Sequence, residues 1–409
     1  MSQVRKKKTS KTLVENSFKP QTATIDSLIN SYCFDKAINL IEADISRCEN
    51  LGQTTKDLEK QHARALLGKN MLEAVEKVTI VDSFVVDKSQ ILKVIALDSN
   101  CGHILTPQQI KQEANLKQMP IGMGFLNNFR DQVVFCQSGK GGVVSLVSSE
   151  KFGDKWSTPR PLAGLVDSVA QRGYPFVLAD GITLYFASKD SCSLGGYDIY
   201  STRFDSEDKA YLKPQNMGMP FNSTANDYMM AFDEVNQLGW FVSDRFQPQD
   251  KVCVYVFIPS QTRQTYENLS EAQLLKVAQI HDIKSTQKGY ENVVANARKK
   301  LKDISSTNPS DNQHEAFAFN VAYGIRYTSL SQFRNSEAKK MTESLLSLKK
   351  KNNELLGLLK ENRQKFEASQ SAIERKALQP MILRQEQEAE DLYKQINDLA
   401  NKIRKAEHP

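Results

Sequence analysis

The sequence lacks long hydrophobic runs. No stretch approaches the roughly 20 consecutive apolar residues that a membrane helix needs, so the chain as written is not expected to span a bilayer. Hydrophobic residues make up 40% of the chain and charged residues 25%, a balance typical of a soluble folded protein. Because 409 residues exceed one ordinary domain of about 100–200 residues, we expect two or three structural regions.

Paired cysteines are also missing. The six cysteines are spread along the chain without any CxxC pair: Cys33, Cys48, Cys101, Cys136, Cys192 and Cys253. Sparse cysteines of this kind are usually small buried hydrophobic residues rather than disulfides or metal ligands. They therefore indicate no particular compartment.

A stripe of basic residues interleaved with aromatic residues is absent as well. The formal net charge is only +6, and part of it lies in a basic tail: Arg5, Lys6, Lys7, Lys8 and Lys11. We therefore predict that residues 1–22 are a disordered, solvated tail, and we expect no nucleic-acid partner.

The start of the sequence lacks a secretory signal peptide. Its basic cluster leads directly into Thr9-Ser10-Lys11-Thr12 instead of an apolar run of about 7–15 residues. Taken alone, this start places the chain in the cytoplasm. A mature or mis-started form whose signal lay upstream would begin in the same way, so both localisations stay open.

No catalytic or metal-binding constellation is visible. The histidines are scattered and form neither HExxH nor a Cys/His metal spacing: His62, His103, His281, His314 and His408. The segment 139–142 lacks the spacing of a phosphate-binding loop and predicts a hairpin turn. Asp180, Asp198 and Asp233 suggest a glycosidase, but nothing places two carboxylates about 5–9.5 Å apart. We therefore expect no enzyme, no cofactor and no metal.

Residues 23–76 predict a helical hairpin. Apolar residues recur at helical spacing from Leu28 to Ile45, and the pattern resumes at Leu58 after an interruption at residues 51–53. Residues 31–38 resemble the turn between the two helices of a tetratricopeptide repeat, in which aromatic and small residues let paired helices approach closely. A plain helical hairpin is the alternative.

The strongest positive signal is a unit that occurs three times. Each copy has a short apolar strand with an aromatic residue at the same point, then a polar turn and a second strand. The three strand pairs are 133–138 with 141–146, 184–188 with 195–200, and 239–243 with 252–256. Phe135 and Phe186 are 51 residues apart, and Phe186 and Phe241 are 55 apart. Trp156 and Tyr211 repeat the spacing of 55, so the register extends beyond the strands.

Such units are typical of propeller blades, which are four-stranded antiparallel sheets buried on both faces. Gly181 suits a hairpin turn with positive φ, and Gly195-Gly196 allows a tight connection or a close backbone approach. Four aromatic residues are expected to fill the space between blades: Tyr185, Phe186, Trp240 and Phe241. The other residues expected to define blades are Trp156, Asp180, Asp198 and Tyr200.

The segment 180–188, followed by residues 194–200, resembles the WD-like, TolB-type propeller repeat of Bacteroidota envelope proteins. The linking residues 214–223 and Asp227-Tyr228 are also similar to that family. The resemblance is strong over residues 156–255, weaker over 77–155 and absent elsewhere. It implies a periplasmic or outer-membrane-associated scaffold without catalytic activity; a cytoplasmic adaptor is the alternative.

The expected fold is mainly β with helical ends: a β-propeller of four or five blades, regular or irregular, over residues 77–335. A capping box at Ser270 opens a helical insert near residues 268–306. Three clear units are fewer than the four that a closed propeller needs. We expect residues 78–97 and 314–330 to supply the missing strands, and pairing of the first and last strands in one blade would close the ring.

Residues 336–409 predict coiled-coil helices. Apolar residues alternate at spacings of four and three, with Asn352 as a candidate for fixing the register, and Pro380 is expected to break the helix. A hairpin folded at Pro380 and a kinked rod that pairs with another chain are both compatible with this pattern. We favour a homo-oligomer through residues 336–408, because so narrow an apolar seam needs a partner.

The predicted function is that of a non-enzymatic scaffold, which presents a rigid propeller face to a protein partner or an envelope polymer. The alternative is a propeller hydrolase acting on glycans or peptides. Asp198, Asp244 and Arg245 lie near blade ends and are candidates for an interaction site, because loops on a rigid scaffold often carry function. Turn capping or a salt bridge between blades would explain the same residues.

Overall fold

The computed structural model describes residues 18–139, 142–152, 155–166, 170–260, 262–306, 319–322, 325–327, 329–369 and 371–407. The basic cluster of the predicted tail lies outside them. The chain divides into two compact units, Met1–Asn70 and Met71–Pro409. None of the helices in the described ranges has both the length and the apolar composition that crossing a membrane requires.

The first unit is helical, as its apolar spacing predicts. It contains three helices, α1 (Thr22–Asn30), α2 (Phe34–Asn50) and most of α3 (Lys56–Glu73). The turn between α1 and α2 contains Tyr32 at φ 60°. Phe34, the first residue of α2, packs its ring against Gly68 of α3. A Cβ at Gly68 would collide with that ring, so the glycine allows α2 and α3 to approach closely.

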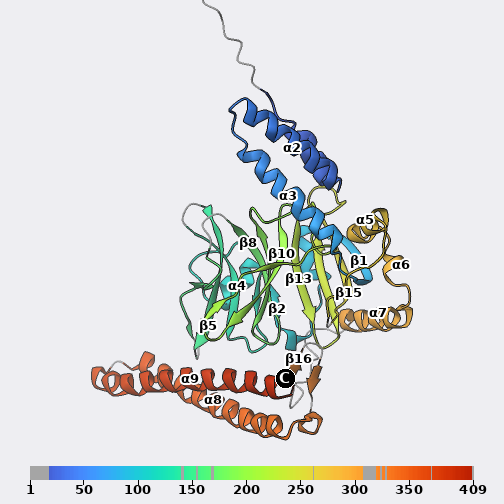
Figure 1. Ribbon diagram of the computed structural model, residues 1–409. Helices are drawn as coiled ribbons and strands as arrows, with labels where there is room; N and C mark the ends of the chain where they lie inside the picture. Colours follow the sequence, from blue (N-terminus) through green and yellow to red (C-terminus); the bar gives the residue numbers. More distant parts are fainter. Residues whose placement is uncertain are drawn as a thin grey trace, which may run out of the picture. The chain divides into compact units, whose positions relative to one another are not determined.

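Three antiparallel sheets form the body of the second unit (Figure 1). The first contains β2 (His103–Leu105), β3 (Gly124–Leu126), β4 (Gln132–Ser138), β5 (Val144–Phe152), β6 (Lys155–Trp156) and β7 (Arg160–Pro161). The second contains β8 (Gln171–Val177), β9 (Thr183–Lys189), β10 (Asp198–Asp205), β11 (Ala210–Tyr211) and β12 (Gln215–Asn216). The third contains β13 (Asp227–Asp233), β14 (Leu238–Ser243), β15 (Lys251–Ile258) and β1 (Thr79–Asp87).

The three predicted hairpins are confirmed as pairs within these sheets. β4 pairs with β5, β9 with β10 and β14 with β15, all antiparallel. The turn predicted at residues 139–142 connects β4 to β5, although residues 140–141 lie outside the described ranges. Each copy of the repeat therefore builds the same part of a different sheet.

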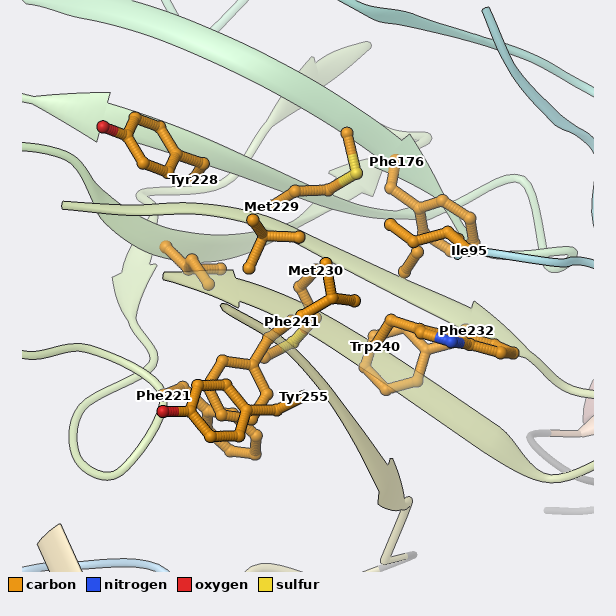
Figure 2. Close-up of a cluster of buried hydrophobic side chains, with 14 of the residues drawn as sticks. Ile95, Phe176, Phe221, Tyr228, Met229, Met230, Phe232, Trp240, Phe241 and Tyr255 are labelled. Carbon is orange, nitrogen blue, oxygen red and sulfur yellow. The ribbon is translucent and has the colours of Figure 1, made fainter. Parts of the chain in front are cut away.

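Aromatic side chains join neighbouring sheets into one core. The ring of Phe176 in the second sheet lies 4.9 Å from that of Phe125 in the first and 6.2 Å from that of Phe232 in the third. Tyr185 also contacts Phe232, at 4.8 Å. Figure 2 shows Phe176, Phe232 and Trp240 in this cluster, with Ile95 packed among them. Rings at such distances add stabilisation beyond that of buried area alone.

The third sheet is completed by a strand from far away in the sequence. β1 pairs with β15 along its whole length, so the first strand of the unit lies beside the last strand of the third repeat. A β-bulge between Ile80 and Asp82 interrupts the register. Part of the outer edge of β1 is covered, because Gln287 and Arg298 donate to the carbonyls of Ile80 and Val81. Covering an edge in this way removes a site for unwanted strand pairing.

The covering side chains come from the predicted helical insert. It comprises α5 (Glu271–Gln279), α6 (Ile283–Thr286) and α7 (Glu291–Ser306). The capping box at its start is confirmed: the Gln273 side chain accepts from the Ser270 amide at 2.9 Å. After β1, the chain crosses to the first sheet through the 3₁₀ turns η1 (Lys88–Lys93) and η2 (Ser99–Cys101), and α4 (Pro107–Glu113) follows β2.

The prediction that residues 314–330 supply a blade strand is wrong for the residues that the structure describes. β16 (Phe319–Ala322) and β17 (Ile325–Tyr327) pair only with each other in the sheets that are described. Their apolar side chains Phe319, Val321 and Tyr327 instead join a separate core with the C-terminal helices. Burial against those helices replaces pairing with a larger sheet.

Two long helices, α8 (Ser336–Ala368) and α9 (Ala372–Glu407), form the C-terminal part as an antiparallel hairpin. Leu345 packs near Ile403 at one end, and Leu355 packs near Leu392 further along. The apolar seam is therefore filled within one chain. A homo-oligomer through this region remains a prediction.

The break between these helices lies at residues 369–371, not at Pro380, which sits inside α9. Both Pro380 and Lys376 are exposed, so the carbonyl that loses its intrahelical donor can bond to water. At the actual break, the Ser371 amide donates to the Ser369 hydroxyl at 3.1 Å. A serine side chain that bonds the local backbone competes with helix formation.

Helices at both ends of the chain and several antiparallel sheets between them in sequence are thus confirmed, and no sheet formed by the described residues closes on itself. A closed propeller ring is not shown.

Candidate functional site

Asp198, one of the predicted blade-end candidates, is fully buried. Its carboxylate accepts hydrogen bonds from the amides of Leu194 and Gly195, at 2.8 and 3.1 Å, and from the Asn216 side chain at 2.8 Å. Burial raises the pKa of Asp198 to about 7 in spite of these three donors. The residue fastens the loop that precedes β10, and no free surface is left for a ligand.

Arg245, the second candidate, is also buried, with only 2% of its surface exposed. Its guanidinium donates to the carbonyls of Pro220 and Phe221 and to the Asp227 carboxylate, at 2.7, 2.7 and 2.8 Å. It therefore holds the linker between the second and third sheets against the start of β13.

The three aspartates that suggested a glycosidase lie in separate local networks. Asp180 accepts from the Ile182 and Thr183 amides in its own turn. Asp233 accepts from the amides of Asp98 and Asn236. Each of these carboxylates therefore accepts hydrogen bonds from backbone amides.

The predicted blade-defining residues are placed by packing and turns. Gly181 has φ 68° in the turn beside Asp180. Phe186 stacks on Tyr200 at 6.0 Å, and Phe241 stacks on Tyr255 at 4.7 Å. Three further members lie in the core or partly buried against it: Trp156, Tyr185 and Trp240.

A cluster of three tyrosines lies where the second and third sheets meet. Tyr174 belongs to β8, Tyr197 to the loop before β10 and Tyr228 to β13. The ring centroids lie 5.5 Å apart for Tyr174 and Tyr228, 5.9 Å for Tyr197 and Tyr228, and 6.4 Å for Tyr174 and Tyr197. Tyr174 and Tyr197 are partly exposed, whereas Tyr228 is 7% exposed. We call these three residues the tyrosine cluster.

Asp244, the third blade-end candidate, lies beside the tyrosine cluster. Its carboxylate accepts from the Tyr228 hydroxyl at 2.7 Å, and Lys88 donates to the Tyr228 oxygen at 2.9 Å. The Lys88 ammonium also lies 5.0 Å from the Tyr228 ring centroid and 3.6 Å from Asp244. In Figure 2 the Tyr228 hydroxyl points away from the apolar cluster. A cation, a phenol and a carboxylate thus form one polar group beside the rings.

Two glycines allow the loop before β10 to lie close to residues 225–226 beside the tyrosine cluster. A Cβ at Gly195 would collide with the Ala225 carbonyl, and a Cβ at Gly196 would collide with the Asn226 side chain. The backbone thus approaches closely at Gly195, whereas the close neighbour of Gly196 is a side chain. Asn226 accepts from the Tyr197 amide at 3.1 Å and donates to Asp244 at 2.9 Å, so it ties the Tyr197 loop to Asp244.

The phenols in the cluster are poor acids. Burial raises the pKa of Tyr174 to about 12 and also raises the pKa of Tyr197. For Tyr228, burial raises the pKa, and its hydrogen bond to the Asp244 carboxylate raises it further. The hydroxyls therefore stay protonated at neutral pH, as hydrogen-bonding groups on rigid rings rather than as bases or nucleophiles.

Sequence reasoning found Asp244 but missed the tyrosines and Lys88. Tyr174 and Tyr228 occupy matching places before the turns of their repeats, and this correspondence could have marked them. No sequence pattern around Lys88 indicates a site, because Lys88 reaches the cluster only through the pairing of β1 with β15.

Comparison with protein-family models, with curated protein sequences and with solved structures gives no match. Among the described residues, no group of three or more histidine, cysteine, aspartate or glutamate side chains could hold a metal ion. The six cysteines are free thiols, of which only Cys192 is exposed.

Proposed function

We propose that this chain is a non-catalytic scaffold, built on a propeller-type stack of TolB-like blades, and that the tyrosine cluster is its recognition surface. The observation that carries the proposal is the convergence of Tyr174, Tyr197 and Tyr228 with Lys88 and Asp244 from five separate chain segments.

Two features of the sheets support a propeller-type arrangement. Three repeated hairpins stand in neighbouring sheets, with β8 packed against the first sheet and β13 against the second. The third sheet combines the first strand of the unit with the last three strands of the repeat, as propellers do when they fasten their ends.

Three features of the cluster favour recognition over catalysis. Rigid tyrosine rings give a large contact area at little cost in side-chain entropy, and tyrosine is enriched where proteins bind their partners. Lys88, Asp244 and Asn226 surround the rings with polar groups that can set orientation. The raised pKa values keep the phenols protonated, which suits binding better than proton transfer.

The partner is a protein or a polymer of the cell envelope, and the proposed location is periplasmic or outer-membrane-associated. A cytoplasmic adaptor with a protein partner is the competing proposal on location. Propeller hydrolase activity is the competing proposal on function.

Site-specific photocrosslinking in the native cell tests the recognition surface. The photoreactive residue p-benzoylphenylalanine replaces Tyr197 in one variant and Tyr290, which is 54% exposed on the helical insert, in a matched control. We expect a discrete adduct from position 197 and none from position 290. Digestion of the adduct with a protease or with a glycan hydrolase then distinguishes a protein partner from an envelope polymer.

Equal adducts at both positions, or no adduct at position 197, would show that the tyrosine cluster is not the recognition surface. If the chain turns over a glycan or peptide, and substitution of Asp198 and Asp233 abolishes this activity, the hydrolase proposal is favoured over the scaffold proposal.

A further inference from the structure

A cavity of about 550 Å³ lies beside β2, and none of its lining residues belongs to the tyrosine cluster. The cavity lies between the crossover that follows β1 and the helix α4, and β2 lines it along its whole length. From these positions we infer that the cavity binds an extended peptide segment of a partner protein, which adds to the sheet beside β2.

β2 is an edge strand. Among the described residues it pairs only with β3, with His103 opposite Leu126 and Leu105 opposite Gly124. In an antiparallel ladder, successive residues direct their amide and carbonyl groups alternately toward the partner strand and away from it. At least one of the three residues of β2 therefore directs these groups away from β3. An added strand would find hydrogen-bonding partners there.

The two walls of the cavity differ in a way that suits a strand. The crossover contributes an apolar wall of Leu92, Ile95 and Leu97. The opposite wall carries Gln109, Gln112 and Glu113 from α4, together with Arg130 from the turn before β4. Side chains of a strand point alternately to opposite faces, so a segment that alternates aliphatic and polar residues matches both walls.

The remaining N–H donors of Arg130 select the polar positions of that segment. Arg130 donates one bond to Glu113, at 2.6 Å, and its side chain is 54% exposed. A guanidinium has five N–H donors, so this arginine retains donors for an incoming carboxylate. The carboxamides of Gln109 and Gln112 add neutral donors and acceptors. We therefore assign the site to peptides in which aliphatic residues alternate with acidic ones.

The neutral state of His103 fits the same ligand. The ring is partly buried at the cavity edge, and burial and the nearby Arg130 charge lower its pKa. A neutral imidazole offers one donor and one acceptor, which is what the polar groups of a peptide backbone require.

Backbone pairing can be tested with peptides of one sequence. The probe is a fluorescein-labelled Val-Glu-Val-Glu-Val amide, titrated against the full chain by fluorescence anisotropy. Two matched versions carry N-methyl groups on alternate amides, one on each edge of the extended peptide. Only one edge of an added strand can pair with β2, so we expect one methylated version to bind about tenfold or more weakly and the other to bind like the parent.

The site is located by two tryptophan substitutions on one helix. Gln112 lines the cavity, whereas Gln108 is exposed on α4 and does not line it. Gln112→Trp is expected to abolish peptide binding and Gln108→Trp to preserve it. No binding of the parent peptide, equal binding of the two methylated versions, or equal effects of the two substitutions would overturn the inference.

The inference does not depend on the proposed function. Tyr197→Ala is expected to leave peptide binding unchanged, so failure of one site can be told from failure of the other.

Discussion

Arg245 and Asp227 form an ion pair at 2.8 Å in which both side chains are shielded from water, with exposed fractions of 2% and 0%. Arg245 also stands over the rings of Phe241 and Tyr255, at 5.7 and 5.9 Å. Its guanidinium also donates to two carbonyls of the linker before β13 and to the Ser243 hydroxyl. The pair therefore fixes the entry of the chain into the third sheet.

Arg245→Met is expected to reduce the free energy of unfolding by about 3–5 kcal/mol, because it leaves the Asp227 carboxylate buried without its cation. Urea denaturation followed by tryptophan fluorescence measures this loss, since Trp240 is buried in the same sheet. In the double variant Asp227→Asn with Arg245→Met, most of the stability should return. A double variant no more stable than Arg245→Met would show that the ion pair does not account for the loss.

Gly195→Ala is expected to prevent the loop before β10 from closing on the third sheet. The new Cβ would collide with the Ala225 carbonyl, a backbone atom that cannot rotate away. We expect a loss of stability above about 3 kcal/mol or no folded protein. Gly173→Ala is the matched control, because nothing lies within 4 Å of a Cβ there. Thermal unfolding compares the two, and similar melting temperatures would contradict the close approach at Gly195.

The raised pKa of Glu234 predicts that the free energy of unfolding depends on pH. Burial raises its pKa to about 7, and the nearby Asp180 charge adds to the effect. Between about pH 4.5 and 7 the folded chain holds a proton that the unfolded chain has released, so stability falls as pH rises through this range. The full change is about 3 kcal/mol.

Glu234→Gln should remove that change and keep the acceptor for the Ala179 amide, which bonds to Glu234 at 2.8 Å. Denaturation of both proteins at pH 5 and pH 8 is the measurement. An unchanged pH dependence in the variant would assign the effect to another group, such as Asp198.

Much of the local structure could be predicted from the sequence. The three hairpins were located because aromatic strands and glycine turns are short-range signals that each repeat carries in full. The capping box at Ser270 and the interruption after α2 are equally local. The predicted helix break at Pro380 was wrong. Proline removes one intrahelical hydrogen bond, but a helix can continue through it when the carbonyl that loses its donor faces water.

Contacts between distant segments could not be predicted in this way. Nothing near Lys88 indicates that it will reach Tyr228, since that contact needs β1 to pair with β15. Similarly, a charged residue beside a turn is expected to be exposed to solvent. Arg245 instead points inward and bonds linker carbonyls that come close to it only in the folded chain. β2 and α4 went unrecognised because their apolar runs are too short to show a period.

The most direct test of the recognition surface is the affinity for the partner recovered from the position-197 adduct, measured by isothermal titration calorimetry. The wild-type chain is compared with Tyr197→Ala and with the control Tyr290→Ala, each first shown to unfold at a temperature close to that of the wild type. The account predicts that Tyr197→Ala weakens binding by about tenfold or more and that Tyr290→Ala leaves it unchanged. Wild-type affinity in Tyr197→Ala would contradict it.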